Sequence, residues 1–291
     1  MIWLENRGFA MKTILLPFHD EDAGRTALEA ACVVAQHFGS YLEGLLVREG
    51  PHIDFGTGIA IPPEYLSEAT AEWRRFAESV RKHFVAVTGE RGMPPGEVES
   101  AAEGPMVGWH EMEGRESDVV GEYGRLFDLI VIGRTTQDPT ARWQATCEGA
   151  LFESGRPVLL ATPRAPKILG GTAVIAWNGS TETARTVALT MPFLAAAAKV
   201  VVLSVEGDTV TGPHGGEMAA HLARNGIKAT ATTVEAAGRT IGDAILEEAA
   251  ALGADLLVKG AYTRNRLRQI IFGGATQHVL RYAAIPLLMA H

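Results

Sequence analysis

Short apolar runs alternate with amphipathic segments along the whole chain. In the second half, apolar runs of the strand type cover 172–177, 199–205, 227–234, 255–260 and 286–290. Apolar residues at helical spacing lie between them, over 181–194, 214–225 and 240–252. In the first half we expect strands at 12–18, 41–47, 107–112, 129–132 and 157–161, and helices at 22–38 and 117–126. This alternation predicts an α/β fold, a mostly parallel sheet with helices on both faces.

The two halves repeat one another. DLIVIG at 128–133 matches DLLVKG at 255–260, and PVLLA at 157–161 matches PLLMA at 286–290. The paired glycines are 260 − 133 = 127 residues apart and the paired prolines 286 − 157 = 129. The opening strands, KTILLP from residue 12 and TAVIAW from residue 172, match at an offset of 172 − 12 = 160. We therefore predict two domains, 11–163 and 171–291, joined by the proline- and glycine-containing segment TPRAPKILGG at 162–171.

The larger offset of the opening strands predicts an insertion in the first half, at about 49–90. It begins with a glycine- and proline-rich stretch and continues as a helix over 64–87. Trp73, Phe76, Val80 and Phe84 recur there at helical spacing. Core packing is the favoured interpretation of these side chains, and a surface for a partner is the alternative.

Composition excludes several classes of protein. The formal charge of −8 and the pI near 5.6 argue against a general nucleic-acid-binding protein, which needs a basic surface. Cys32 and Cys147 lie one in each half without CxxC spacing, so we expect buried structural thiols, not a disulfide or a redox motif.

The expected location is the cytoplasm. No apolar run is long enough to span a bilayer, so no membrane insertion is expected. The first ten residues lack the basic and apolar regions of a signal peptide, and Met11 is an alternative start.

The residues after the last DLLVKG strand suggest an anion site. Gly260 ends that strand, and Gly273-Gly274 opens a short helical pattern. In an open parallel sheet, ligands bind at the carboxyl edge, and a glycine-rich turn leading into a helix N-terminus presents backbone N–H groups to an anion. Four cations, Lys259, Arg264, Arg266 and Arg268, surround this loop.

No catalytic or metal centre is predicted. His110-Glu-Met-Glu113 lacks the second histidine of HExxH, and His214 with Glu217 has no further ligands clustered nearby. The chain contains neither a G-x-S-x-G elbow nor a G-x-x-x-x-G-K-S/T loop.

Residues 11–291 resemble a tandem universal stress protein, with two copies of the UspA-type fold. The nucleotide loop of that family follows the fourth strand and has the form G-x2-G-x9-G-(S/T). Here its four positions hold Gly260, Thr263, Gly273 and Gly274, so two of them match at the right spacing. The resemblance implies two Rossmann-like five-stranded domains that form an internal pseudo-dimer through PVLLA and PLLMA. Whether the whole chain also forms a homodimer stays open.

The resemblance further implies ATP or another adenine nucleotide, with magnesium, in the second domain. The positions that would hold it are Ala176, Asn178, Val202, Gly260, Thr263, Arg264, Gly273, Gly274 and Ala275. Asn178 stands where the family has an aspartate for the adenosine moiety, and it keeps an acceptor and gains a donor. Val202 or Leu203 would line the base site. Thr263 adds a side chain where the family has glycine.

The first-half loop departs further from the pattern. After Gly133 it runs RTTQDPTARWQATCEGALF, with Gln144 and Ala145 where the glycine and the hydroxyl residue belong. His19 stands in place of the aspartate, and a packed loop residue is its favoured interpretation. We expect the first-half nucleotide site to be lost.

The favoured hypothesis is a cytoplasmic stress-response protein that binds and regulates and is not a dedicated enzyme. One alternative is slow ATP hydrolysis at the same loop, for which the sequence offers no general base. The other is a nucleotide-free scaffold that binds an apolar molecule or a partner protein through 55–84.

Overall fold

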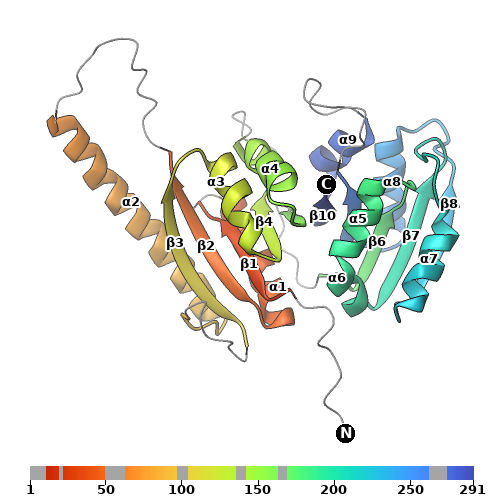
Figure 1. Cartoon of the computed structure of the whole chain (residues 1–291), viewed down its shortest axis with the longest axis horizontal. Coiled ribbons are helices and arrows are strands. Elements are labelled where there is room, and N and C mark those ends of the chain that lie inside the picture. The colour runs from red at the N-terminus through yellow and green to blue at the C-terminus, as the bar shows by residue number, and fades with distance from the viewer. Residues whose placement is uncertain are drawn as a thin grey trace, which may run out of the picture.

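Ten strands form one continuous sheet in the order β3-β2-β1-β4-β5-β10-β9-β6-β7-β8 (Figure 1). The structure, a computed structural model, describes residues 11–19, 22–49, 63–96, 104–135, 142–162, 169–261 and 274–291. The first-half strands are β1 (Thr13–Pro17), β2 (Tyr41–Arg48), β3 (Met106–Glu113), β4 (Leu129–Gly133) and β5 (Val158–Ala161). The second-half strands are β6 (Thr172–Ala176), β7 (Lys199–Val205), β8 (Ala229–Val234), β9 (Leu256–Gly260) and β10 (Leu287–Ala290).

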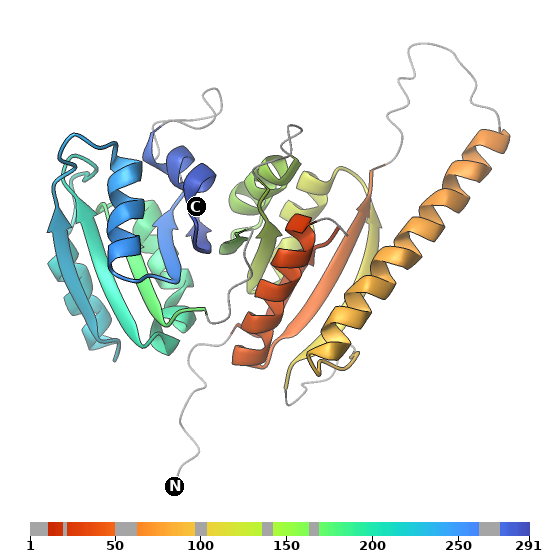
Figure 2. The same ribbon diagram turned by 180° about the vertical axis from the view of Figure 1, so that it is seen from behind.

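Helices cover both faces of each half-sheet (Figures 1 and 2). In the first half, α1 (Asp22–Phe38) and α2 (Pro63–Glu90) pack on one face, and α3 (Glu116–Tyr123) and α4 (Arg142–Glu153) on the other. In the second half, one face carries α5 (Thr181–Leu189), α6 (Met191–Ala196) and α7 (Gly215–Arg224), and the other α8 (Ile241–Ala251) and α9 (Ala275–Tyr282). The predicted α/β fold, with two similar five-stranded halves, is confirmed.

The pairing of β5 with β10 joins the two halves. It is antiparallel, with Leu287 opposite Leu160 and Leu288 opposite Leu159, whereas every other strand pair described is parallel. All residues of both strands are buried. The final strand of each half therefore has no free edge, as the resemblance implied for an internal pseudo-dimer.

The internal repeat has an opening offset one residue shorter than the sequence comparison indicated. Asp128 accepts a hydrogen bond from the Thr13 amide (3.0 Å), and Asp255 accepts one from the Thr172 amide (3.3 Å). These anchors make Thr13 the counterpart of Thr172, at 172 − 13 = 159 residues, so the offset of 160 was wrong. A sequence comparison can align two similar apolar strands one residue out of register. The hydrogen bonds of Asp128 and Asp255 to the first residue of each opening strand define the register in the structure.

Helix α2 occupies the crossover between β2 and β3, the place that α7 has between β7 and β8. It has 28 residues against 10 in α7, and its N-terminal end extends away from the sheet (Figure 1). Val80 and Phe84 are 1% exposed, which confirms their core role, but Phe76 is 46% exposed. The core interpretation of Phe76 was wrong, because helical spacing predicts a face but not how far the sheet beneath it extends.

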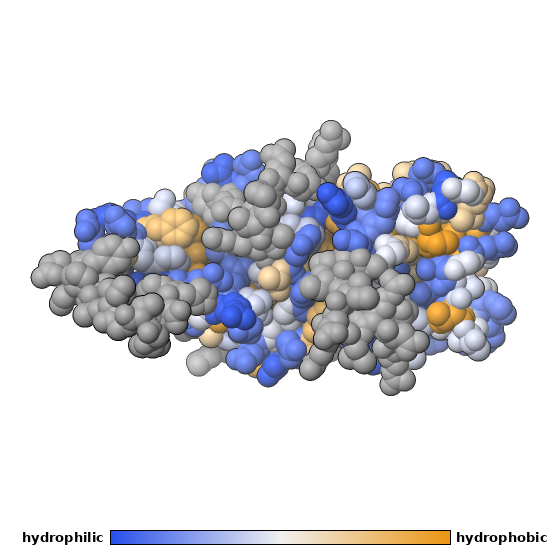
Figure 3. Space-filling model, turned by 90° about the horizontal axis from the view of Figure 1, so that it is seen from above, coloured by the Kyte–Doolittle hydropathy of each residue, from blue (hydrophilic) through white to orange (hydrophobic). Residues whose placement is uncertain are grey.

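On the face of the molecule that Figure 3 shows, apolar side chains are scattered. Figure 3 shows mostly hydrophilic residues on the face seen from above, with separate apolar ones between them.

Both cysteines are buried and unpaired, and burial raises the pKa of Cys32 to about 11 and that of Cys147 to about 12. These are the expected inert thiols. Within the described residues, no helix is both long and apolar enough to cross a membrane.

A buried arginine makes a second contact between the halves. Arg134 directly follows β4, is 5% exposed, and donates from Nη1 to the Leu280 carbonyl of α9 (2.6 Å). Its Nη2 donates to the carbonyl of Ala283, the C-cap of the same helix. Carbonyls at a helix C-terminus lack intrahelical partners and carry partial negative charge, so a cation stabilises them. A residue of the first half thus holds the end of a second-half helix.

Replacing Arg134 with methionine should lower the free energy of unfolding by about 2–4 kcal/mol, because two buried carbonyls lose charged donors. Urea denaturation followed by circular dichroism measures the change. Arg224→Met removes the same charge from the exposed end of α7, and we expect a change within about 0.5 kcal/mol. Equal losses in the two variants would contradict a clamping role for Arg134.

Candidate functional site

The strand order places a topological switch point between β6 and β9. From β6 the chain moves outward to β7 and β8, and then returns to β9 on the opposite side of β6. All these strands are parallel, so their carboxyl ends share one edge. The helices that leave this edge in opposite directions open a crevice in such sheets, and ligands bind there. This edge is the candidate site.

Asn178, just beyond β6, is 6% exposed and held by the turn that leads into α5. Its Oδ1 accepts hydrogen bonds from the Ser180 amide (3.1 Å) and the Thr183 hydroxyl (2.8 Å). A backbone amide can only donate, so the side-chain atom facing Ser180 is the oxygen. Among the described residues, both hydrogen bonds of the Asn178 side chain are made by Oδ1, and none is made by Nδ2. The acceptor is therefore engaged inside the protein, and Asn178 offers a ligand its donors.

Gly260, the last residue of β9, is a glycine because α5 approaches it closely. A Cβ at this position would lie 2.6 Å from the Thr183 nitrogen and 2.7 Å from the Thr183 hydroxyl oxygen. The match of Gly260 to the nucleotide-loop pattern therefore has a packing cause as well. The end of β9 and the N-terminus of α5 meet directly beside Asn178.

Gly274 is the N-cap of α9 and has a backbone conformation that favours glycine, with φ 74° and ψ −146°. Ala275 is the first residue of the helix. The remaining predicted loop positions, Thr263, Arg264 and Gly273, lie outside the described residues. The structure therefore places both ends of the loop at the carboxyl edge of β9.

Two of the predicted nucleotide-binding residues, Ala176 and Val202, lie on opposite faces of the sheet. Ala176 belongs to the face covered by α8 and α9, whereas Val202 is fully buried on the face covered by α5 and α7. Leu203 is opposite Ala176 in register and shares its face.

Lys259 is a charged residue in the otherwise apolar core of β9. It is 3% exposed, lies opposite Ala176 in register, and shares the sheet face of Leu257 under α8 and α9. Among the described residues, its ammonium forms no hydrogen bond or ion pair, and Asp208 is the acid whose charge acts on it. Burial lowers the pKa of Lys259, and the charge of Asp208 raises it.

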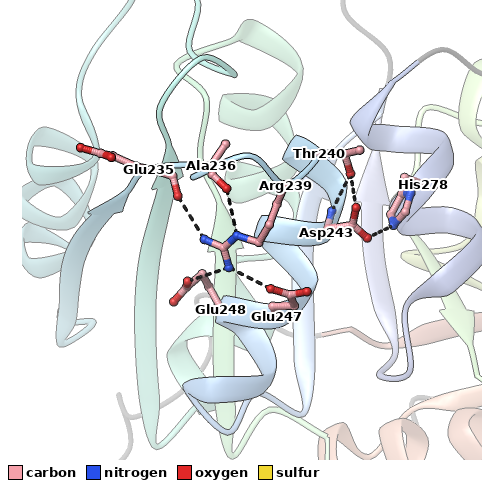
Figure 4. A network of polar contacts seen from close by, with 8 residues as sticks. All are labelled: Glu235, Ala236, Arg239, Thr240, Asp243, Glu247, Glu248 and His278. Atoms are coloured by element: carbon pink, nitrogen blue, oxygen red, sulfur yellow. Dashed lines mark hydrogen bonds and ion pairs between the residues drawn. The ribbon is translucent and has the colours of Figure 1, made fainter.

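Helices α8 and α9 are joined by a polar contact beside this edge (Figure 4). Thr240 caps α8 by accepting from the Asp243 amide (3.1 Å), and its hydroxyl donates to the Asp243 carboxylate (2.6 Å). That carboxylate lies 2.7 Å from Nε2 of His278 in α9. A Cβ on Gly242 would come within 2.6 Å of the His278 side chain. Close packing and a hydrogen-bonded pair thus fix α9 against α8.

A second group in Figure 4 holds the loop before α8. Arg239 contacts Glu247 (2.9 Å) and Glu248 (3.2 Å), and it donates to the carbonyls of Glu235 and Ala236. These contacts connect the entrance of α8 to its last turns. Neither this group nor the pair of Asp243 with His278 was predicted from the sequence, although the Thr240–Asp243 spacing is an N-cap signal.

In the first half, the Glu116 carboxylate occupies the corresponding edge of the sheet. His19 corresponds to Asn178 at the 159-residue offset, and its Nε2 contacts the Glu116 carboxylate. Glu116 also accepts from the Thr146 hydroxyl (2.6 Å). Helix α4 begins at Arg142, one turn before the counterpart of Ala275, so Gln144 and Ala145 are helical. Where the second half has hydrogen-bond donors and Gly274, the first half has the Glu116 carboxylate and a helix α4 that begins earlier.

Residues 180–291 match the family model of the universal stress protein family. The second half of the chain belongs to the universal stress protein family. No curated protein matches the sequence.

Solved structures resemble the chain over nearly its whole length. A universal stress protein from Archaeoglobus fulgidus DSM 4304 is 15% identical, with 97% of this chain and 96% of that chain covered and a TM-score of 0.70. A protein from Pseudomonas aeruginosa PAO1 described as functionally unknown is 18% identical, with 97% and 92% covered and a TM-score of 0.56. At these identities the likeness concerns the fold, and it extends the fold of the universal stress protein half to the first half.

Lys259→Met should raise the free energy of unfolding at neutral pH by about 1–3 kcal/mol, because it removes a buried charge without a close partner. The wild-type value should approach that of the variant as pH rises toward 10.5, the ordinary lysine pKa, since the folded chain then binds fewer protons than the unfolded chain. Urea denaturation across this pH range measures the difference. A difference that does not change with pH would contradict the burial of a charged group.

Asp243→Asn should loosen α9 without unfolding the protein, because the amide cannot form the same ion pair with His278. Hydrogen exchange followed by mass spectrometry should show faster exchange in 275–282. Glu247→Gln, at the other end of α8, serves as the control that leaves α9 unchanged. Unaltered exchange in both variants would mean that packing alone holds the helix.

Proposed function

We propose that the second half of this chain binds an adenine nucleotide, ATP foremost, at the carboxyl edge of β6 and β9. The protein then acts as a nucleotide-responsive regulator in a stress response and not as a dedicated enzyme. The observation that carries this proposal is that the Nδ2 donors of Asn178 and the N-terminus of α9 both lie at the switch point of the universal stress protein half. Magnesium would arrive with the phosphates of the nucleotide.

Backbone geometry supports a phosphate-binding role. Both ends of the loop that leaves β9 lie at this edge, and Gly274 opens the N-terminus of α9. Unpaired backbone N–H groups and the helix dipole favour an anion at such a position. We propose the nine residues of the sequence analysis as the site: Ala176, Asn178, Val202, Gly260, Thr263, Arg264, Gly273, Gly274 and Ala275.

The first half lacks a site of this kind, so we propose that each chain binds one nucleotide. In the first half, the Glu116 carboxylate would repel a phosphate, and α4 replaces the end of the loop. We propose 11–163 as a structural domain, with its long helical segment at about 49–90, and 171–291 as the nucleotide-binding domain.

Gly274→Val should weaken ATP binding roughly tenfold or more, because valine is strained at φ 74° by about 1–3 kcal/mol and the N-terminus of α9 would shift. Isothermal titration calorimetry with ATP and AMP measures the affinity and the stoichiometry, expected as one nucleotide per chain. Gly226→Val is the matched control, since Gly226 has φ 80° and open space at the far end of α7. No heat from the wild type at millimolar ATP would end the nucleotide proposal.

A further inference from the structure

Lys259 occupies a position where the fold itself accepts an aliphatic side chain. Its counterpart in the first half is Ile132, at the same offset of 259 − 132 = 127 that relates the two glycines. Ile132 is also 3% exposed and packs among apolar residues on the matching face of its own half-sheet. The duplicated scaffold therefore does not need a lysine for packing. A lysine here places a positive charge beneath the candidate site.

The protein supplies little to balance that charge. Among the described residues, Asp208 is the acidic group whose charge acts on Lys259, and no ion pair joins the two side chains. Asp208 lies in the turn after β7, is itself partly buried, and burial raises the pKa of its carboxyl. A buried ammonium without a close counter-charge is costly for the folded state. A position of this kind is stabilised when an anion binds beside it.

The neighbouring groups point to the same ligand chemistry. Lys259 lies opposite Ala176 in register. Asn178 follows two residues after Ala176, and its Nδ2 donors form no hydrogen bond to a described residue. The N-terminus of α9 adds backbone donors at the end of the same strand. The switch point of the second half thus presents donors and a cation, whereas the first half presents the Glu116 carboxylate.

We propose that Lys259 provides the counter-charge for an anionic group of the ligand, so that the second-half site selects phosphorylated ligands over neutral ones. The inference rests on the proposed nucleotide site and narrows its ligand class: a nucleoside phosphate binds, and the corresponding nucleoside binds far more weakly. Lys259 is thereby a specificity-determining residue of that site.

The test compares ATP, AMP and adenosine by calorimetry on the full chain, as wild type, Lys259→Met and Lys199→Met. Lys199 begins β7 at the opposite edge of the sheet and is exposed, so its variant makes the same charge change away from the site. We expect Lys259→Met to weaken ATP and AMP at least tenfold and to leave adenosine within about twofold, which corresponds to at least about 1.4 kcal/mol of phosphate-specific binding. Its melting temperature without ligand should rise.

Three results would overturn the proposal, and the first two arise while the wild type binds nucleotide, so they are distinct from a failure of the nucleotide site. If Lys259→Met binds all three ligands as the wild type does, nucleotide binding stands and the role of Lys259 is refuted. An equal loss for all three ligands means that the variant disturbs the site as a whole and also refutes it.

If the wild type binds no adenine compound, the proposed function fails, and pyrophosphate becomes the probe. Pyrophosphate binding that is lost in Lys259→Met but kept in Lys199→Met would support Lys259 as the counter-charge in an anion site of another kind. The absence of pyrophosphate binding is the third refuting result.

Discussion

The antiparallel pairing of β5 with β10 is the contact on which the rest of this structure depends. Each half alone would end in a short apolar strand with an open edge, and such an edge pairs readily with other chains. Pairing the two edges inside one chain removes that risk and merges two parallel half-sheets into one. It also brings the end of β4 next to α9, where Arg134 caps the helix. The helix that opens the candidate site is therefore held at its far end by the other half.

The two halves show how one scaffold diverges through the chemistry of a single edge. Strand order and helix placement are the same in both, and the aspartate anchors of the first strands coincide. At the carboxyl edge, the first half has His19 bound to an acid, and the second has donors and a buried lysine. Because the backbone is shared, loss of a site in one half leaves the fold intact. That half can then serve as a support for the other.

The two described glycines of the loop are required for different structural reasons. Gly260 is required by contact with α5, and Gly274 by its positive φ, so each would be needed without any ligand. A glycine pattern is therefore weaker evidence for a phosphate than donors on buried residues at the candidate site that form no hydrogen bond to a described residue. For the function of this protein, Asn178 and Lys259 weigh more than the number of matched glycines.

The sequence by itself determined the elements and their order. It predicted α1 at Asp22–Phe38 and β7 at Lys199–Val205 with the observed bounds, because apolar periodicity and local stop signals define a helix or a strand directly. The resemblance to universal stress proteins implied that the final strands would pair, as they do. Only the tertiary structure decided the one-residue register of the opening strands, the exposure of Phe76, the engagement of the Asn178 oxygen and the contact of Arg134 with α9. Each of these depends on which side chains from distant segments meet, and that is set by sheet register and helix orientation, which local periodicity does not encode.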